Sequence, residues 1–492
     1  MNYLNVFKVT GFILFIESFL MIPPLLISMY YHQSDQYAFL ISIIIIAAMG
    51  VPLAVLKTST HSIKIKEGLA IVTLGWLLTS ALGAMPYVIS GSIPSYVDAF
   101  FETVSGLTTT GASIVNDVES LPRGILFWRS FTHWIGGMGI LVFTIALLPT
   151  IGAGGFQLFK AESPGPISDK IVPGIKKTAI ILYLTYLTLT LLEMILLVIG
   201  GMSWYESALH TFGTVGTGGF STRNASIAAF DSNYIQLVIA VFMVLAGVNF
   251  SLFFFLFKRK WRDIFGNEEF RLYLCIILTT TVLIASNLYF TAYEGRLGTS
   301  IRDAFFQVSS IMSTTGYATA DYNQWPTFSK NILFLLMFIG GSAGSTTGAI
   351  KVLRILILFK LIKRELLKIQ HPRAVMAIKL QNKALSSGVT TSIVSFFVLY
   401  ILLFIGGTVF ISLEDIGLES AASAVAATLG NIGPGFGLVG PTENFSGFSD
   451  FSKIIFSILM LFGRLELFTI LAFIMPLNVR KEKHKGFKEY KA

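Results

Sequence analysis

The sequence predicts an all-α polytopic membrane protein in which four M1–P-loop–M2 pseudo-repeats surround one pore, after a two-helix N-terminal prefix. Apolar residues make up 54% of the 492 residues and charged residues 13%, whereas a soluble domain carries about a quarter charged residues. Many apolar residues gather in runs of about 20, the length that crosses a hydrocarbon core of roughly 30 Å. Four short segments between such runs are similar to one another. Each opens with an acid and ends in a turn rich in Thr or Gly: Asp98–Ser113, Glu206–Ser221, Asp303–Ala318 and Glu419–Gly435.

The apolar segments predict ten membrane spans. The first contains Glu17 and the pair Pro23–Pro24, so we expect it to be kinked, and no cleavage pattern suggests that it is removed. The predicted spans are residues 9–30, 38–56, 69–90, 125–149, 178–200, 234–257, 270–292, 331–363, 387–411 and 452–477.

These spans and the four similar segments divide the chain into six parts, with basic linkers between the repeats. The expected parts are a two-span prefix at 1–67, pore repeat 1 at 68–150, a linker with pore repeat 2 at 151–258, pore repeat 3 at 259–365, a basic linker with pore repeat 4 at 366–478, and a basic tail at 479–492.

The charge distribution sets the expected orientation. Most Lys and Arg residues fall in the loops and tails on one side when the N-terminus is placed inside, as the positive-inside rule requires. We therefore expect cytoplasmic N- and C-termini, and membrane lipid rather than nucleic acid as the partner that the net charge of +9 reflects. The opposite side is rich in Asp and Glu, which favours capture of a cation. The single cysteine, Cys275, excludes an internal disulfide.

The four similar segments are too short to cross the membrane. Ten helical residues rise about 15 Å, half of the hydrocarbon core. We expect each segment to enter as a half-length helix and to return as the turn, with its opening acid capping the helix N-terminus. Their C-terminal dipole ends would then favour a cation at the turns.

The turns supply the candidate selectivity filter. Aligning them on one glycine each predicts that backbone carbonyls, with some threonine hydroxyls, replace the hydration shell of K⁺. No acid lies inside any turn, which argues against Mg²⁺ or Ca²⁺. The alternative is four membrane-embedded turns with glycine at tight packing sites. The candidates are Thr109, Thr110 and Gly111; Gly216, Thr217 and Gly218; Thr314, Thr315 and Gly316; and Asn431, Ile432 and Gly433.

A run of small residues interrupts span 331–363. It consists of Gly340, Gly341, Ser342, Ala343, Gly344, Ser345, Thr346, Thr347 and Gly348. Each glycine costs a helix about 1 kcal/mol relative to alanine, so a straight helix is not expected. We interpret the run as a flexible gate under the filter, the alternative being a kinked helix packed against its neighbours.

Two further readings concern this region. Arg464 lies inside the last span, where an arginine is costly and tends to face a cavity or a partner. We expect it to face the ion path opposite the small-residue run, as part of the gate; pairing with Glu466 is the alternative. Gly340–Gly344 also matches the G-x-S-x-G pattern of hydrolases, but the strand–turn–helix context of that motif is missing, so no enzyme activity is expected.

With these residues the chain resembles the Trk-type potassium uptake membrane subunits, the TrkH/TrkG family, in a superfamily with the Ktr and plant HKT transporters. The resemblance covers essentially the whole length. It depends on four stretches, and the two-span prefix favours the TrkH-like branch: His133–Gly139, Gly216–Ser221, Gly340–Gly348 and Gly463–Glu466.

The resemblance implies a homodimer with one pore per subunit, in the bacterial inner membrane, opened by a cytoplasmic nucleotide-binding ring of the TrkA type. Gly111 stands where sodium-passing plant relatives have serine, which favours K⁺. The chain itself would bind K⁺ as its transported ion and no organic cofactor. Channel-like uptake is the expected function. The alternatives are H⁺- or Na⁺-coupled symport and less selective K⁺/Na⁺ conduction.

Overall fold

The computed structural model describes residues 2–57, 63–139, 175–374, 376–381 and 383–474, and the side chains of these except residues 175–177. Parts of the predicted span 125–149 and of the linker at 151–177, together with the predicted tail 479–492, lie outside the described residues or side chains. Within the described ranges the regular elements are helices, apart from one short antiparallel hairpin of β1 (Lys379–Leu380) and β2 (Lys383–Ala384).

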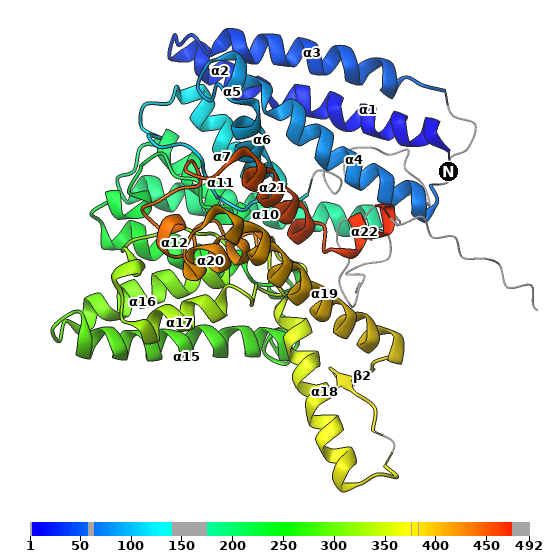
Figure 1. Cartoon of the computed structure of the whole chain (residues 1–492), viewed down its shortest axis with the longest axis vertical. Coiled ribbons are helices and arrows are strands. Elements are labelled where there is room, and N and C mark those ends of the chain that lie inside the picture. Colours follow the sequence, from blue (N-terminus) through cyan, green and yellow to red (C-terminus); the bar gives the residue numbers. More distant parts are fainter. Residues whose placement is uncertain (1, 58–62, 140–174, 375, 382, 475–492) are drawn as a thin grey trace, which may run out of the picture.

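One order of elements occurs four times: a long helix, a short helix that ends in a turn, and a further helix. The short helices are α6, α11, α16 and α20, at the positions expected for half-length helices (Figure 1). The first three helices precede this pattern. The bounds are α1 Tyr3–Leu20, α2 Ile22–Tyr30, α3 Gln36–Ala54; α4 Ile65–Gly83, α5 Met85–Ile89, α6 Tyr96–Leu107, α7 Arg123–Gly137; α10 Ile175–Ile199, α11 Trp204–Gly216, α12 Asn233–Ala246, α13 Phe250–Phe257, α14 Trp261–Phe265; α15 Glu268–Thr291, α16 Leu297–Met312, α17 Thr327–Leu336, α18 Val352–Gln370; and α19 Ser387–Ile411, α20 Leu418–Leu429, α21 Asp450–Arg464, α22 Phe468–Ile474. Short 3₁₀ helices lie at Ser226–Ala229, Tyr322–Gln324, Ser412–Glu414 and Gly437–Val439.

Six helices in the described part of the chain are long and apolar enough to cross a membrane, and eight if each of two bent pairs counts as one span. The expected ten straight spans are therefore wrong in two places. The predicted span 234–257 is two helices, α12 and α13, bent by 97°, and the predicted span 452–477 contains α21 and α22, bent by 112°. As expected, the first span is interrupted before its proline pair, at Met21 between α1 and α2.

The prefix packs closely on the first repeat of the pattern. Helix α1 lies against both α3 and α4 (Figure 1). Glycine makes the first approach possible, because a Cβ on Gly11 would lie 2.5 Å from the amide nitrogen of Ala54, and one on Gly50 would lie 2.9 Å from that of Phe15. Small residues at such crossings let helix backbones meet in a membrane.

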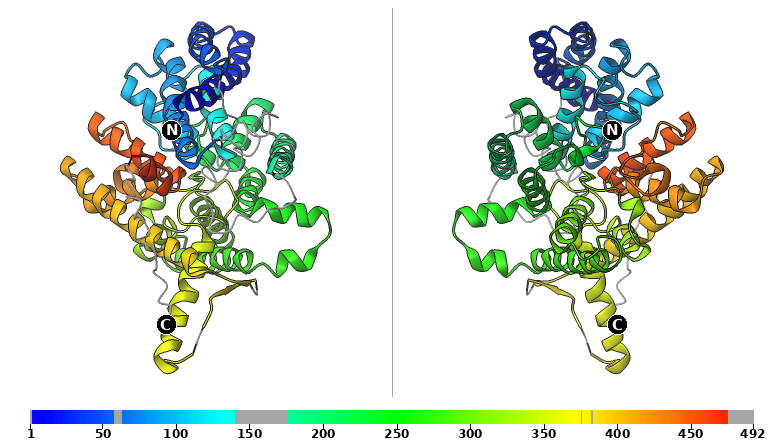
Figure 2. Two further views of the ribbon diagram at one scale, coloured as in Figure 1. Left: turned by 90° about the vertical axis from the view of Figure 1, so that its right-hand side faces the viewer. Right: turned by 90° about the vertical axis from the view of Figure 1, so that its left-hand side faces the viewer.

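In the two views of Figure 2 the helices follow one another in chain order around the middle of the molecule. Helix α18 and the β1–β2 hairpin project from this body. Lys360 of α18 pairs with Glu268 at the start of α15 and donates to the carbonyl oxygen of Lys379 in the hairpin, 2.7 Å away. These contacts join the projecting basic segment to the third repeat of the pattern.

The expected capping by the opening acids is corrected by the structure. Ser95 and Ser203 cap α6 and α11, accepting bonds from the amides of Asp98 and Glu206, and α16 starts six residues before Asp303. The acids form ion pairs instead. Asp98 lies 2.6 Å from Lys453, Glu206 2.7 Å from Arg223, Asp303 2.9 Å from Arg302, and Glu419 3.2 Å from Lys330. The Asp98 and Glu419 pairs join different repeats of the pattern.

Candidate functional site

The four turns share one backbone geometry. The first position of each turn, Thr109, Thr217, Thr314 or Asn431, has a left-handed φ of 53° to 58°. The second position, Thr110, Gly218, Thr315 or Ile432, donates its amide to the carbonyl five residues earlier, at 2.8 or 2.9 Å. The third position, Gly111, Gly219, Gly316 or Gly433, has a φ of 77° to 103°, a region that glycine enters without strain.

This geometry corrects the alignment of the second turn. The expected triplet Gly216, Thr217 and Gly218 is one residue out of register, since Gly216 still belongs to helix α11. The residues equivalent to those of the other turns are Thr217, Gly218 and Gly219. The candidate triplets of the first, third and fourth turns keep their positions.

The turns contact one another in a closed ring, called here the four-turn ring. A Cβ on Gly111 would collide with the carbonyl oxygen of Gly218, one on Gly219 with that of Thr315, and one on Gly316 with that of Ile432. The circle closes because a Cβ on Gly433 would lie 2.7 Å from the carbonyl oxygen of Thr110. The second-position carbonyl of each turn thus lies against the third-position glycine of the adjacent turn. Four segments far apart in sequence therefore surround one centre.

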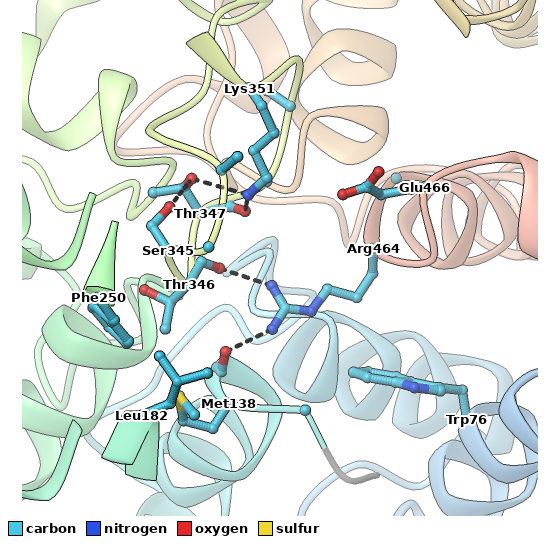
Figure 3. A pocket seen from close by; sticks show the side chains of 17 residues that line it. Trp76, Met138, Leu182, Phe250, Ser345, Thr346, Thr347, Lys351, Arg464 and Glu466 are labelled. Atoms are coloured by element: carbon cyan, nitrogen blue, oxygen red, sulfur yellow. Dashed lines mark hydrogen bonds between the residues drawn. The ribbon is translucent and has the colours of Figure 1, made fainter. Parts of the chain in front are cut away.

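A cavity lies on each side of this ring. The glycine-side cavity, of about 130 Å³, is lined by all four third-position glycines. The loop-side cavity, of about 120 Å³, is lined by residues 343–349 of the small-residue run, by Lys351, and by Gly463 and Arg464 (Figure 3). The two cavities and the ring between them mark a candidate path through the protein.

A buried ion pair that the sequence analysis missed holds the first two turns together. Glu102 of α6 accepts from the Nε of Arg129 at 2.6 Å and from the Ile114 amide at 3.0 Å. Arg129 also donates to the carbonyl oxygen of Ser221 at 3.0 Å, and its guanidinium lies 3.6 Å from the ring centroid of Phe220. Both charged side chains are at most 4% exposed. An arginine within the predicted span 125–149 was the available signal.

His133 supports the same two turns. Its Nδ1 lies 2.7 Å from the carbonyl oxygen of Gly106, and its Nε2 accepts from the Phe220 amide at 3.2 Å. A neutral imidazole satisfies both contacts when Nδ1 carries the proton. The ring also packs where a Cβ on Gly218 would stand. These bonds fix the backbone on both sides of the second turn.

Residues Gly340–Gly348, called here the small-residue loop, contain no helix. The Ser342 amide donates to the Gly247 carbonyl oxygen at 2.8 Å, and the Phe250 amide donates to the Gly344 carbonyl oxygen at 3.0 Å. The loop thus occupies the break between α12 and α13. Glu269, another buried acid missed in the sequence, accepts from the Ala343 amide at 2.6 Å.

Arg464 contacts both the small-residue loop and the ring. Its Nη1 donates to the Thr346 carbonyl oxygen at 2.8 Å and lies 3.3 Å from the Thr109 hydroxyl (Figure 3). Its Nη2 donates to the carbonyl oxygens of Gly136 and Gly137. Glu466 forms an ion pair with Arg354. The alternative of a pair between Arg464 and Glu466 is therefore wrong in this structure.

The chain matches known proteins over nearly its full length. The model of the family described as "TrkH: Cation transport protein" matches residues 34–481. The Trk system potassium uptake protein TrkH of Escherichia coli strain K12 is 40% identical, over 97% of this chain and 99% of the relative. TrkG of the same strain is 35% identical, over 94% of this chain and 95% of the relative. The crystal structure of the potassium transporter TrkH from Vibrio parahaemolyticus superposes with a TM-score of 0.86 at 34% identity, covering 97% of this chain and 99% of that one.

Proposed function

This chain belongs to the TrkH family of cation transport proteins, and on that basis we propose that it takes up potassium through the four-turn ring as a selectivity filter. The fold matches that of a multi-pass potassium transporter, and the described relatives are transporters rather than enzymes. The proposal includes four pseudo-repeats around one pore, with the repeat boundaries given above.

One observation carries the proposal: a ring of four turns with a cavity on either side. Its third-position glycines allow the backbones to approach closely, and its second-position carbonyls supply neutral oxygens from every repeat. Neutral carbonyl oxygens can replace the hydration shell of a large monovalent cation. The filter consists of Thr109–Gly111, Thr217–Gly219, Thr314–Gly316 and Asn431–Gly433.

In this proposal the small-residue loop and Arg464 form the gate on the loop side of the ring. The guanidinium adds a positive charge to the path, and the hydrogen bonds of the loop hold it there. The bacterial inner membrane, cytoplasmic termini, a homodimer and a separate nucleotide-binding ring of the TrkA type complete the proposal, on the strength of the family. The relatives' names, which describe one protein of a Trk system, support a partner of this kind.

Flux in liposomes tests the function. We expect purified protein to pass K⁺ and Rb⁺ well and Na⁺ poorly, with a reversal potential that shifts by about 59 mV for each tenfold change in the K⁺ gradient. A pH or Na⁺ gradient should leave that potential unchanged. Dependence on either gradient would favour coupled symport, and equal passage of Na⁺ would favour unselective conduction.

Replacing Arg464 with alanine should raise the K⁺ flux about tenfold in the absence of any partner. This corresponds to removing roughly 1.4 kcal/mol from the barrier, the order of a charge interaction near a partly hydrated path. Arg464→Lys, which keeps the charge, is the matched variant and should stay closer to the unmodified protein. Liposome flux with both variants measures the effect, and an Arg464→Ala flux equal to that of the unmodified protein would remove Arg464 from the gate.

A further inference from the structure

The first positions of the four turns carry side-chain oxygens in equivalent places. Thr109, Thr217, Thr314 and Asn431 share the left-handed φ described above, and each is completely buried. Together they provide three hydroxyl oxygens and one amide oxygen, with no carboxylate among them. Such a set of neutral oxygens suits a dehydrated monovalent cation better than Mg²⁺ or Ca²⁺.

Two of these oxygens are occupied by parts of the proposed gate. The Gly348 amide donates to the Thr314 hydroxyl at 2.8 Å, and Arg464 lies 3.3 Å from the Thr109 hydroxyl. Both donors belong to residues that line the loop-side cavity. These first positions therefore lie at the loop-side end of the ring.

Asn431 lies beside the same two parts. Its Nδ2 donates to the Thr110 hydroxyl at 3.0 Å and to the Met460 carbonyl oxygen at 2.9 Å, which fixes the amide plane. Its Oδ1 is buried and accepts no hydrogen bond within the described part of the chain. A Cβ on Gly348 would lie 3.2 Å from this oxygen, so the amide oxygen faces the small-residue loop. A buried oxygen without a donor is costly unless something else binds it.

The second repeat is contacted one residue earlier. The Thr346 hydroxyl donates to the Val215 carbonyl oxygen at 3.1 Å, near the C-terminal end of α11. The Thr217 hydroxyl, in contrast, bonds the adjacent Gly216 carbonyl oxygen at 2.7 Å. The loop and Arg464 therefore bond or contact every repeat at this end of the ring.

We propose that the side-chain oxygens of Thr109, Thr217, Thr314 and Asn431 form a further cation site, which binds K⁺ only when the small-residue loop and Arg464 have withdrawn. A hydroxyl that accepts from an amide or a guanidinium has its lone pair directed at that donor, and the guanidinium repels a cation nearby. Withdrawal frees the Thr109 and Thr314 oxygens and removes the charge in one step. The closed gate and the occupied site thus exclude each other. This inference rests on the proposed function and adds to it a ligand set that the gate controls.

Thr314→Val provides the test, because valine keeps the shape of threonine and cannot ligate a cation. We expect the KM for K⁺ in liposome flux to rise about tenfold, with a maximal rate equal to or above that of the unmodified protein, since the bond to the Gly348 amide is also lost. Thr314→Ser should keep the original KM. Thr280→Val, on α15, is a matched control whose hydroxyl bonds only within its own helix, to Ile276 and Ile277, and should change neither quantity.

A binding measurement separates the site from the gate. K⁺ should raise the melting temperature of Arg464→Ala more than that of the unmodified protein, and Arg464→Ala/Thr314→Val should lose the extra shift. A higher maximal rate for Thr314→Val with an unchanged KM would overturn the site, because Thr314 would then act only as a gate contact. Absence of K⁺ flux in the unmodified protein would instead overturn the proposed function.

Discussion

Replacing Gly316 with alanine is expected to reduce selective K⁺ flux at least about a hundredfold. The φ of 84° already strains an L residue by about 1–2 kcal/mol. The added methyl group would collide with the carbonyl oxygen of Ile432 and lie 2.7 Å from the Cδ of Pro434. The third and fourth turns must therefore move apart, and the distances between coordinating oxygens change with them. A loss of 2.7 kcal/mol of ion stabilisation corresponds to a hundredfold.

Gly298→Ala is the matched control for this variant. Gly298 lies on α16, the same short helix that leads to Gly316, and a Cβ there meets nothing within 4 Å. Flux of K⁺, Rb⁺ and Na⁺ in liposomes should be normal for Gly298→Ala and lost or unselective for Gly316→Ala. Normal selectivity in Gly316→Ala would show that the ring does not select the ion.

Arg129→Met is expected to destabilise the protein by about 3–5 kcal/mol, because it leaves the Glu102 carboxylate buried without a countercharge. The first two turns would also lose the bond from Arg129 to the Ser221 carbonyl oxygen. We expect the melting temperature in detergent to fall by at least about 5 °C. The double variant Glu102→Leu/Arg129→Met removes both charges and should recover most of this loss. A double variant as unstable as the single one would contradict the role assigned to the pair.

The sequence contains enough information for the general fold, because the apolar runs and the four similar segments obey simple length rules. A short helix followed by a Thr/Gly turn was expected at four places and is found at α6, α11, α16 and α20. The register of the second turn could not be derived in the same way. Its Gly-Thr-Gly-Gly run offers three glycines, and the structure places Thr217, not a glycine, in the left-handed first position.

Helix breaks and buried partners were harder to predict. The break after Ala246 lies in an apolar run where Gly247 and Asn249 gave little warning, and it depends on bonds to a loop about 95 residues later in the chain. The second break follows Arg464, with Glu466 and Leu467 at φ values of 53° and 56°. Local sequence cannot report either condition. Glu269 was equally hidden, since only the folded chain brings it to the Ala343 amide.

The bend between α12 and α13 links two distant repeats energetically. While the small-residue loop is in place, it accepts from the Phe250 amide and donates to the Gly247 carbonyl oxygen, two groups near the interrupted helix ends. Once the loop leaves, each of these groups would cost about 1–3 kcal/mol if it stayed buried and unpaired. Regular i to i−4 bonding through residues 246–250 is one way to satisfy both. Departure of a segment in the third repeat thus rewards straightening of a rod in the second, so the two rearrangements are expected to occur together as a single cooperative transition.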